Sequence, residues 1–323
     1  MISDDSRWMA AAIALSERSV GRTMPNPGVG CILVRDGVVV GRGWTQPGGR
    51  PHAEAMALAA AGDAGRGATA YVSLEPCAHL SDRGPACADL LSTAGIARVV
   101  IAAGDPDPRT NGAGAARLAA AGIAVTGGVM AAEAEAVMAG YFMRQRHNRP
   151  HITLKLAVSL DGSVAMTSGQ SRWITGDRAR AHAHLERARA DLILVGRGTL
   201  IADDPRLDVR LPGLADRSPA MAVMSASEVG RDDIRRLANP AALAAVTDAD
   251  LVLAEGGAGL ATSLVAADLV DRLLLYRAPV LMGGRPALGA IGLSDLGAAH
   301  RRWAAQPVIE LGPDRLETYL RIR

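Results

Sequence analysis

Short runs typical of β-strands alternate with short helical runs along the first half of the chain, and this order limits the folds that it can adopt. Two apolar runs joined at Asp36-Gly37 predict a β-hairpin over 29–44, because Asp-Gly is a strong turn signal. Strand patterns are expected at 68–75, 97–103 and 123–128, and helical patterns at 6–19, 51–62, 85–95 and 116–122. Short strands separated by helices predict a sheet with helices on both faces.

The pattern restarts near residue 148, which indicates a domain boundary. Residues 133–150 are typical of a helix that ends in a basic run and then in Asn148-Arg149-Pro150, where the proline disfavours further helix. The second half has strand patterns at 151–162, 191–196, 220–226, 249–257, 270–281 and 306–323, and helical patterns at 176–190 and 258–268. We therefore expect two α/β domains, over residues 1–147 and 148–323, each long enough for its own core.

The composition favours a cytoplasmic protein that acts on small molecules. Aromatic residues make up 3% of the chain and the formal charge is +2, so the basic, aromatic-lined face of a nucleic-acid or membrane binder is not expected. The N-terminal apolar run is short and follows acidic residues, unlike a signal peptide, and no apolar run is long enough to span a membrane. Three cysteines are an odd number, which argues against a disulfide framework and leaves the thiols free for metal binding or catalysis.

His52 and Glu54 stand at the start of the helical run PHAEAMALAAAG. In mid-helix their side chains would point roughly 200° apart, at ~100° per residue, so they can converge only on something beyond the N-terminal end of the helix. Cys77 and Cys87 are the candidate partners, and Cys87 opens a second helical run that also begins near a proline. A helix N-terminus lowers the pKa of a thiol and thus favours the thiolate that zinc binds.

His52, Cys77 and Cys87 would provide three protein ligands and leave the fourth tetrahedral position of a zinc ion for water, which is typical of a catalytic site. The remaining cysteine, Cys31, lies in an apolar strand pattern and is interpreted as a buried, inert thiol. His79 is a competing ligand, or it contacts substrate together with Cys77.

Glu54 fits the role of a proton carrier beside this zinc. Zinc lowers the pKa of bound water to about 7, and a carboxylate that is not a ligand can carry protons from that water to a leaving amine. His-x-Glu followed by Pro-Cys and a second Cys is the signature of zinc-dependent nucleobase deaminases, although here nine residues separate the cysteines instead of two. The residues therefore predict hydrolytic deamination.

Four segments of the first half resemble, in order and spacing, the deaminase half of the bifunctional riboflavin-biosynthesis deaminase–reductase family: MPNPGVGCILVRDG, RPHAEAMAL, AYVSLEPCAH and AGDPDPRTNG. The resemblance implies a cytidine-deaminase-like α/β/α fold with His52, Cys77 and Cys87 as zinc ligands and Glu54 as proton carrier. It also implies substrate contacts by Asn26, Arg83, Asp105 and Asp107. The stretch HLSDRGPAC before the second cysteine is one residue longer than is usual in that family.

The second half resembles the reductase half of the same family. In LVLAEGGAGLATSL, a strand pattern is followed by a glycine-rich turn and a helix whose N-terminus could hold a pyrophosphate. LKLAVSLDG, SGQSRWIT, VGRGTLIADDPRLDVR and LVDRLLLYRAP carry the resemblance, which implies a dihydrofolate-reductase-like α/β fold that binds NADPH. The implied cofactor contacts are Ala157, Trp173, Thr199, Asp203, Gly257, Ala258 and Gly259, and the implied substrate contacts are Ser171, Arg187, Leu207, Arg210 and Glu255.

Lys155 is the only lysine, since 34 of the 35 basic residues are arginine. We interpret it as a catalytic ammonium group that polarises the ribose or donates a proton as hydride arrives, where a planar guanidinium would not fit. The alternative is that one lysine has persisted by chance in a chain with a strong bias toward arginine.

Together these expectations describe a multifunctional enzyme of riboflavin biosynthesis. A hydrolase would remove the 2-amino group of 2,5-diamino-6-(5-phosphoribosylamino)pyrimidin-4-one, and an NADPH-dependent oxidoreductase would reduce the ribosyl group of 5-amino-6-(5-phosphoribosylamino)uracil to ribityl. The expected partners are these small molecules, without nucleic acid or membrane, and a homo-oligomer is allowed. Three alternatives stay open: a nucleic-acid deaminase, a deaminase with a non-catalytic C-terminal oligomerisation domain, and a structural zinc protein.

Overall fold

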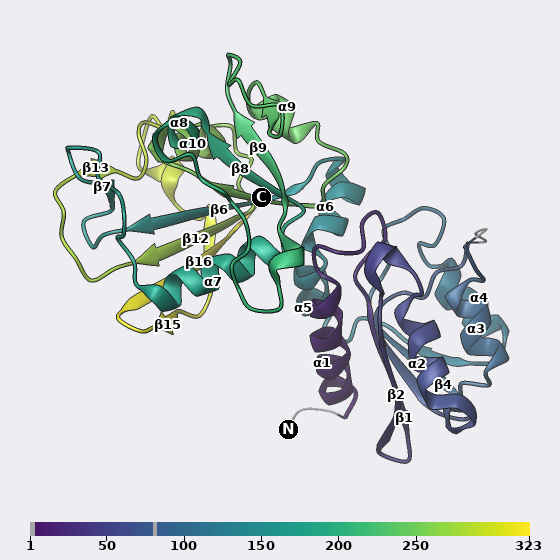
Figure 1. Ribbon diagram of the computed structural model, residues 1–323. Coiled ribbons are helices and arrows are strands. Elements are labelled where there is room, and N and C mark those ends of the chain that lie inside the picture. Colours follow the sequence, from purple (N-terminus) through teal and green to yellow (C-terminus); the bar gives the residue numbers. More distant parts are fainter. Residues whose placement is uncertain (1–3, 80–82) are drawn as a thin grey trace. The chain divides into compact units, whose positions relative to one another are not determined.

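The structure is a computed structural model that describes residues 4–79 and 83–323. The described chain forms two compact units, Met1–Asn148 and Arg149–Arg323, and each is described by itself (Figure 1). At the junction Asn148 ends a helix in the left-handed conformation, with a φ of 52°, which asparagine tolerates better than most residues.

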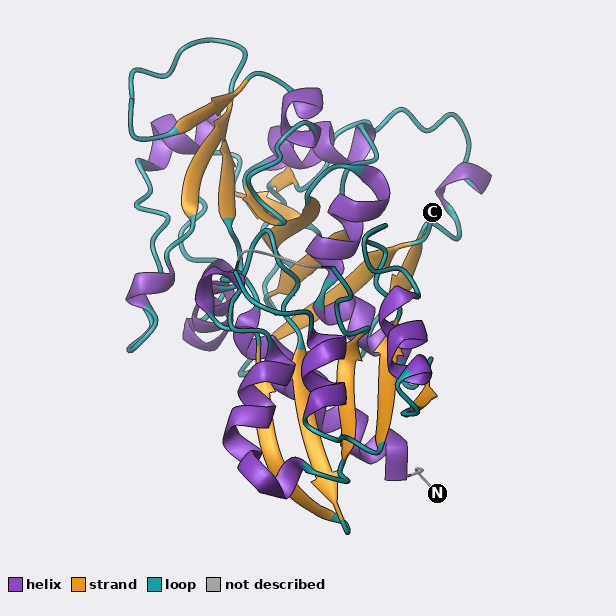
Figure 2. Ribbon diagram, turned by 90° about the vertical axis from the view of Figure 1, so that its right-hand side faces the viewer, coloured by secondary structure: helices purple, strands orange, loops and turns teal. Residues whose placement is uncertain are grey.

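The first unit is a mixed β-sheet between two layers of helices. The strand order is β2-β1-β3-β4-β5, with β1 antiparallel to β2 and β3, and with β3, β4 and β5 parallel. In Figure 1, α1 and α5 lie on one side of this sheet and α2, α3 and α4 on the other, and in Figure 2 helices lie in front of the strands. The elements are α1 (Asp4–Ser16), β1 (Gly30–Arg35), β2 (Val38–Trp44), α2 (Ala53–Ala61), β3 (Thr69–Leu74), α3 (Cys87–Thr93), β4 (Arg98–Ala103), α4 (Ala113–Ala120), β5 (Ala124–Thr126), α5 (Ala131–Val137) and α6 (Ala139–His147).

Glycines bring α2 unusually close to the sheet of the first unit. A Cβ at Gly43 would lie 2.1 Å from the carbonyl oxygen of Ala53, and a Cβ at Gly41 would lie 2.3 Å from that of Ala57. Because side chains alternate along a strand, Gly41 and Gly43 share one face of β2, and this face meets the backbone of α2 directly. The close approach positions the residues at the N-terminal end of α2.

The second unit has a larger sheet of strand order β10-β9-β8-β11-β6-β12-β16-β14, in which β15 also pairs with β16. The strands from β10 to β12 are parallel, and β16 is antiparallel to its neighbours. The elements are β6 (His151–Val158), β7 (Ser163–Ala165), α7 (Asp177–Ala188), β8 (Leu192–Gly196), α8 (Arg197–Asp203), β9 (Ala220–Met224), β10 (Arg235–Leu237), α9 (Pro240–Ala244), β11 (Leu251–Glu255), α10 (Ala258–Ala266), β12 (Arg272–Arg277), β13 (Arg285–Pro286), β14 (Trp303–Ala305), β15 (Ile309–Leu311) and β16 (Asp314–Arg321).

A buried ion pair anchors the start of β6 to the start of β12. The carboxylate of Asp271, which is 4% exposed, accepts two hydrogen bonds of 2.8 Å from the guanidinium of Arg149 and one of 2.8 Å from the backbone N–H of Ile152. Burial opposes ionisation, but these hydrogen bonds and nearby cations outweigh it and lower the pKa of Asp271.

The structure differs from the sequence-based expectation in a few elements. The single helix expected over 133–150 is two helices, α5 and α6, because Met138 between them has φ −98° and ψ 23°. The single strand expected over 306–323 is two strands, β15 and β16. The short elements β7, α8, β10, α9, β13 and β14 were not expected, since none is long enough to show a clear periodicity. None of the helices in the described residues is both long and apolar enough to cross a membrane.

Candidate active sites

The predicted zinc ligands of the first unit converge at the N-terminal ends of two helices. His52 is the N-cap residue of α2, Cys87 is the first residue of α3, and Cys77 lies in the loop that follows β3. Nδ1 of His52 lies 3.3 Å from Sγ of Cys87 and 3.6 Å from Sγ of Cys77, and the three candidate ligand atoms lie within 4.8 Å of one another. One imidazole nitrogen and two sulfurs at this spacing fit a zinc ion with three protein ligands.

The surroundings of the two thiols favour a thiolate. Cys87 donates hydrogen bonds to the sulfur of Cys77 from its thiol and, at 3.3 Å, from its backbone N–H, and His52 adds another, so the pKa of Cys77 is lowered. The neighbouring sulfur and burial raise the pKa of Cys87. Of the two sulfurs, Cys77 therefore ionises more readily, and zinc binding favours the thiolate form of both.

Glu54 and Asn26 complete the surroundings of His52. Glu54, on the first turn of α2, is 3% exposed, and burial raises the pKa of its carboxyl group. Nδ2 of Asn26 donates a 2.8 Å hydrogen bond to the carbonyl of Gly49 and lies 3.0 Å from Nε2 of His52, so that Nδ1 of the ring faces the sulfurs. A buried carboxyl group that is not among the three candidate ligands can exchange protons with a reacting group.

His79 and Cys31, the other candidates considered for the zinc site, lie outside the cluster. Nδ1 of His79 lies 3.5 Å from Oγ1 of Thr110 and does not belong to the cluster. Cys31 is fully buried in β1, and burial raises the pKa of its thiol, as befits an inert residue.

Arg83, a predicted substrate contact, donates a 2.9 Å hydrogen bond to the carbonyl of Gly48. Residues 80–82, where the chain is one residue longer than usual in the family, lie outside the described residues.

Asp105 and Asp107 lie in the loop after β4 and have no described contact with the zinc ligands. Oδ1 of Asp105 accepts a 2.6 Å hydrogen bond from the hydroxyl of Tyr141, and burial raises the pKa of this carboxyl group. Asp107 pairs with Arg109, whose hydrogen bonds lower its pKa. The loop is held by Glu75, which was not predicted: its carboxylate accepts hydrogen bonds from the backbone N–H groups of Gly112, Ala115 and Asp105.

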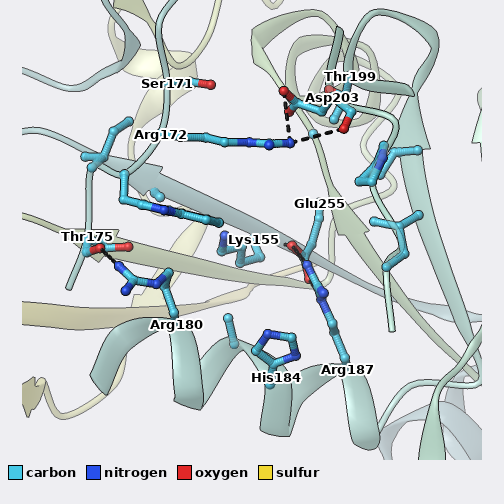
Figure 3. Close-up of a pocket in the computed structure, with 18 of the residues that line it drawn as sticks. Lys155, Ser171, Arg172, Thr175, Arg180, His184, Arg187, Thr199, Asp203 and Glu255 are labelled. Atoms are coloured by element: carbon cyan, nitrogen blue, oxygen red, sulfur yellow. Dashed lines mark hydrogen bonds and ion pairs between the residues drawn. The ribbon is translucent and has the colours of Figure 1, made fainter. Parts of the chain in front are cut away.

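A cavity of about 790 Å³ opens in the second unit (Figure 3). It lies beyond the carboxyl ends of β8 and β11, the edge of a parallel sheet where ligands usually bind. The predicted residues that line it are Lys155, Ala157, Ser171, Trp173, Arg187, Thr199, Asp203, Leu207, Arg210, Glu255 and Gly257. Ala258 and Gly259 are the first residues of α10 and follow directly on this lining.

A charged triad stands inside this cavity. Lys155 on β6 is paired in register with Glu255 on β11, and their charged groups lie 3.8 Å apart. Arg187 of α7 donates two hydrogen bonds, of 2.7 and 2.9 Å, to the same carboxylate. Burial opposes ionisation of Glu255, but Lys155 and Arg187 outweigh it and lower its pKa. Two cations thus share one carboxylate, which leaves an excess of positive charge in the cavity. This excess favours a ligand that brings further hydrogen-bond acceptors.

The turn between β11 and α10 fits the phosphates of a dinucleotide. Gly257 is the N-cap of α10 and makes no side-chain cap hydrogen bond, and a Cβ at Gly257 or Gly259 would meet nothing within 4 Å. Open backbone N–H groups at a helix N-terminus bind anions. Trp173 is 66% exposed, and its indole is in cation–π contact with the guanidinium groups of Arg180, at 4.8 Å, and Arg172, at 5.8 Å. Asp203 pairs with Arg172 at 3.1 Å.

Arg172, Arg180 and His184 also line the cavity and were not predicted. In Figure 3, Arg180 and His184 rise from the same face of α7 as the predicted Arg187, and Arg172 reaches across toward Asp203. The spacing i, i+4, i+7 of the three α7 residues places them on one helix face and could have indicated this basic wall from the sequence.

Two family models match the chain. The model described as the cytidine and deoxycytidylate deaminase zinc-binding region matches residues 2–103, and the one described as the RibD C-terminal domain matches residues 150–310. These matches and the two sheets confirm the predicted order of a cytidine-deaminase-like α/β domain followed by an α/β reductase domain of the RibD type. Zinc and NADPH are the cofactors that the His52, Cys77 and Cys87 cluster and the reductase domain imply.

Known proteins are similar over nearly the whole chain. The riboflavin biosynthesis protein RibD of Mycobacterium tuberculosis is 40% identical over 95% of this chain and 95% of its own length. RibD of Escherichia coli is 48% identical over a shorter match, 67% of this chain and 59% of its own length. The structure of a diaminohydroxyphosphoribosylaminopyrimidine deaminase/5-amino-6-(5-phosphoribosylamino)uracil reductase from Thermotoga maritima is 28% identical, covers 98% of this chain and 99% of its own, and superposes with a TM-score of 0.88. The chain therefore belongs to the RibD family of bifunctional riboflavin biosynthesis proteins.

Proposed function

We propose that the chain catalyses two consecutive steps of riboflavin biosynthesis, a zinc-dependent deamination in residues 1–147 and an NADPH-dependent reduction in residues 148–323. The observation that carries the first step is the cluster of His52, Cys77 and Cys87 with the buried carboxyl group of Glu54 on the adjoining helical turn. The second step rests on the cavity with Lys155 and Glu255 at its base. Relatives over nearly the whole chain length are named for this pathway.

In the deamination, the substrate is 2,5-diamino-6-(5-phosphoribosylamino)pyrimidin-4-one. Zinc, when bound by His52, Cys77 and Cys87, supplies water that ionises near neutral pH. Glu54 takes a proton from the attacking water and delivers it to the 2-amino nitrogen, so that a C–O bond forms, the C–N bond breaks and ammonia leaves. Asn26 and Arg83 contact the substrate from the loops beside His52, and Asp105 and Asp107 contact it from the loop after β4.

In the reduction, the substrate is 5-amino-6-(5-phosphoribosylamino)uracil. NADPH, when bound, supplies hydride to C1′ of the opened sugar. Lys155 donates the accompanying proton, and Glu255 with Arg187 orients the sugar hydroxyl groups. Ser171, Leu207 and Arg210 hold the rest of the substrate, while Ala157, Trp173, Thr199 and Asp203 contact the cofactor and the segment Gly257, Ala258 and Gly259 receives its pyrophosphate.

The same proposal places the enzyme in the cytoplasm, with small pyrimidine ribosyl phosphates rather than nucleic acid or membranes as its partners. Cys31, Cys77 and Cys87 are all free thiols, as a reducing compartment requires. A homo-oligomer is compatible with this function, and light scattering of the purified protein would measure the oligomeric state.

A coupled assay on the purified full-length protein tests both steps. Ammonia release from the diaminopyrimidine phosphate is measured first, and NADPH oxidation is then followed at 340 nm, each with and without a zinc chelator. We expect ammonia release that the chelator abolishes, followed by NADPH oxidation. Ammonia release without NADPH oxidation would contradict the reductase assignment and support a non-catalytic second domain. Neither product with zinc-loaded protein would contradict the proposal as a whole.

A further inference from the structure

His184 lines the reductase cavity, but it is not part of the charged triad of Lys155, Arg187 and Glu255 and has no role so far in the proposed reduction. It lies on α7, three residues before Arg187, and its ring lines the cavity (Figure 3). Both ring nitrogens face Arg210: Nδ1 lies 3.3 Å from the backbone nitrogen of Arg210, and Nε2 lies 3.3 Å from Nη2 of its guanidinium. Burial and the nearby guanidinium groups of Arg187 and Arg210 lower the pKa of His184, which favours the neutral ring.

A neutral imidazole cannot accept from both of these donors. It carries one acceptor nitrogen and one N–H, so one of the two contacts with Arg210 must join two donors. The backbone N–H of Arg210 is fixed in place and depends on Nδ1 of His184 as its acceptor, whereas the half-exposed guanidinium can turn to water. The favoured tautomer therefore accepts at Nδ1 and carries its proton at Nε2.

This tautomer leaves the Nε2–H of His184 and the Nη2–H of Arg210 side by side, and no hydrogen bond to an acceptor among the described residues is recorded for either N–H. Oδ1 of Asp208 lies 3.7 Å from Nη1 of Arg210, an ion pair at the other end of the guanidinium, whereas Nη2 faces His184. Two adjacent N–H donors, one of them cationic, match two oxygens of a phosphate group.

We propose that His184 and Arg210 together bind the 5′-phosphate of the ribosyl substrate, with His184 donating from Nε2. The inference rests on the proposed reductase function and adds His184 as a substrate-binding residue to the set implied by the family. The phosphate satisfies both unpaired donors at once, and it holds the sugar at a fixed distance from Lys155 and Glu255 in the same cavity.

Two substitutions of His184 separate phosphate binding from a merely structural role. His184→Gln places an amide N–H where Nε2 stands, whereas His184→Asn places an acceptor where Nδ1 stands and lacks the outer donor. With full-length enzyme and saturating NADPH, we expect the KM for the phosphorylated uracil substrate to rise about ten- to one-hundredfold in His184→Asn, as for a lost hydrogen bond to a charged group. His184→Gln should restore the KM to within about threefold of wild type, and kcat should change less than KM in both variants.

The opposite order of the two variants would overturn the inference, because a residue that only anchors the backbone of Arg210 is rescued by asparagine and not by glutamine. A rise in the KM for NADPH instead of the substrate would also overturn it, since the anion would then belong to the cofactor. Binding of ribose 5-phosphate, with ribose as control, is measured by calorimetry on the same proteins. Wild-type protein that binds ribose 5-phosphate through His184 but oxidises no NADPH would contradict the proposed function and leave the phosphate site standing.

Discussion

Replacing Glu54 by glutamine tests the deaminase chemistry most directly, because it removes the proton carrier and keeps the shape of the side chain. Glu54 is 3% exposed, and burial raises the pKa of its carboxyl group, so the interior already disfavours the charge that glutamine deletes. Glutamine has the same number of heavy atoms. We therefore expect the free energy of unfolding to change by less than about 1.5 kcal/mol, the range of volume-conserving substitutions.

The expected loss of activity is much larger than the loss of stability. A positioned general acid–base group contributes about 10²- to 10⁴-fold to a rate, which corresponds to about 3–5 kcal/mol of activation free energy. We expect Glu54→Gln to lower the kcat for ammonia release by at least about one hundredfold. The zinc content, measured by elemental analysis, should stay at that of the wild type, because Glu54 is not one of the three candidate ligands.

A matched control is available in the same unit. Glu133→Gln makes the same chemical change at an exposed position on α5 and should leave ammonia release unchanged. NADPH oxidation with the deaminated substrate serves as an internal control in both variants. A loss below about tenfold in zinc-loaded Glu54→Gln would refute the role of proton carrier. Loss of the zinc itself would refute it too, since Glu54 would then act as a ligand.

Three further results are expected. Removing zinc with a chelator should abolish ammonia release and leave the reduction of added deaminated substrate intact, because the candidate metal ligands all lie in the first unit. A parallel loss of NADPH oxidation would contradict this expectation. Lys155→Met should lower the kcat for NADPH oxidation about one hundredfold or more and spare ammonia release, whereas an unchanged kcat would exclude Lys155 as the proton donor. Asp271→Asn should lower the free energy of unfolding of the second unit by about 3–5 kcal/mol in urea, because it removes the buried carboxylate with which Arg149 and Arg323 both pair. The folded-state pKa of Asp271 lies below the ordinary value of about 3.9. The stability that its charge contributes is therefore present above that pH and is lost as the pH falls through the lowered pKa. Acid should destabilise the wild type more than Asp271→Asn, and equal acid sensitivity would argue against the ion pair.

The zinc site could be predicted from the sequence because its information is local. His52 and Cys87 each open a helix near a proline, and helix N-termini project their first residues beyond the helix end, so a short motif fixes most of the geometry. Glu75 escaped prediction for the opposite reason. Its partners Asp105, Gly112 and Ala115 lie 30 to 40 residues further along the chain, and no local pattern indicates which loop a buried carboxylate will hold.

The reductase cavity was predicted as a set of residues but not as an arrangement. Lys155 and Glu255 are neighbours only because β6 and β11 pair in parallel with one specific register, and sequence periodicity does not determine which strands pair. His184 was not predicted because, although its spacing places it on one face of α7 with Arg180 and Arg187, the sequence does not show that this face turns to the cavity. The contact between His184 and Arg210, 26 residues apart, exists only in the folded unit.

The glycines of β2 make the zinc affinity depend on residues that offer no ligand atom. Gly41 and Gly43 let the backbone of α2 rest on the strand, and His52 stands at the end of that helix. A larger residue at either position would push α2 outward and separate Nδ1 of His52 from the two sulfurs, which belong to other segments. In a family alignment or a mutational scan, these two positions would then behave as determinants of metal binding. A weakened metal site would result from the loss of close packing between β2 and α2.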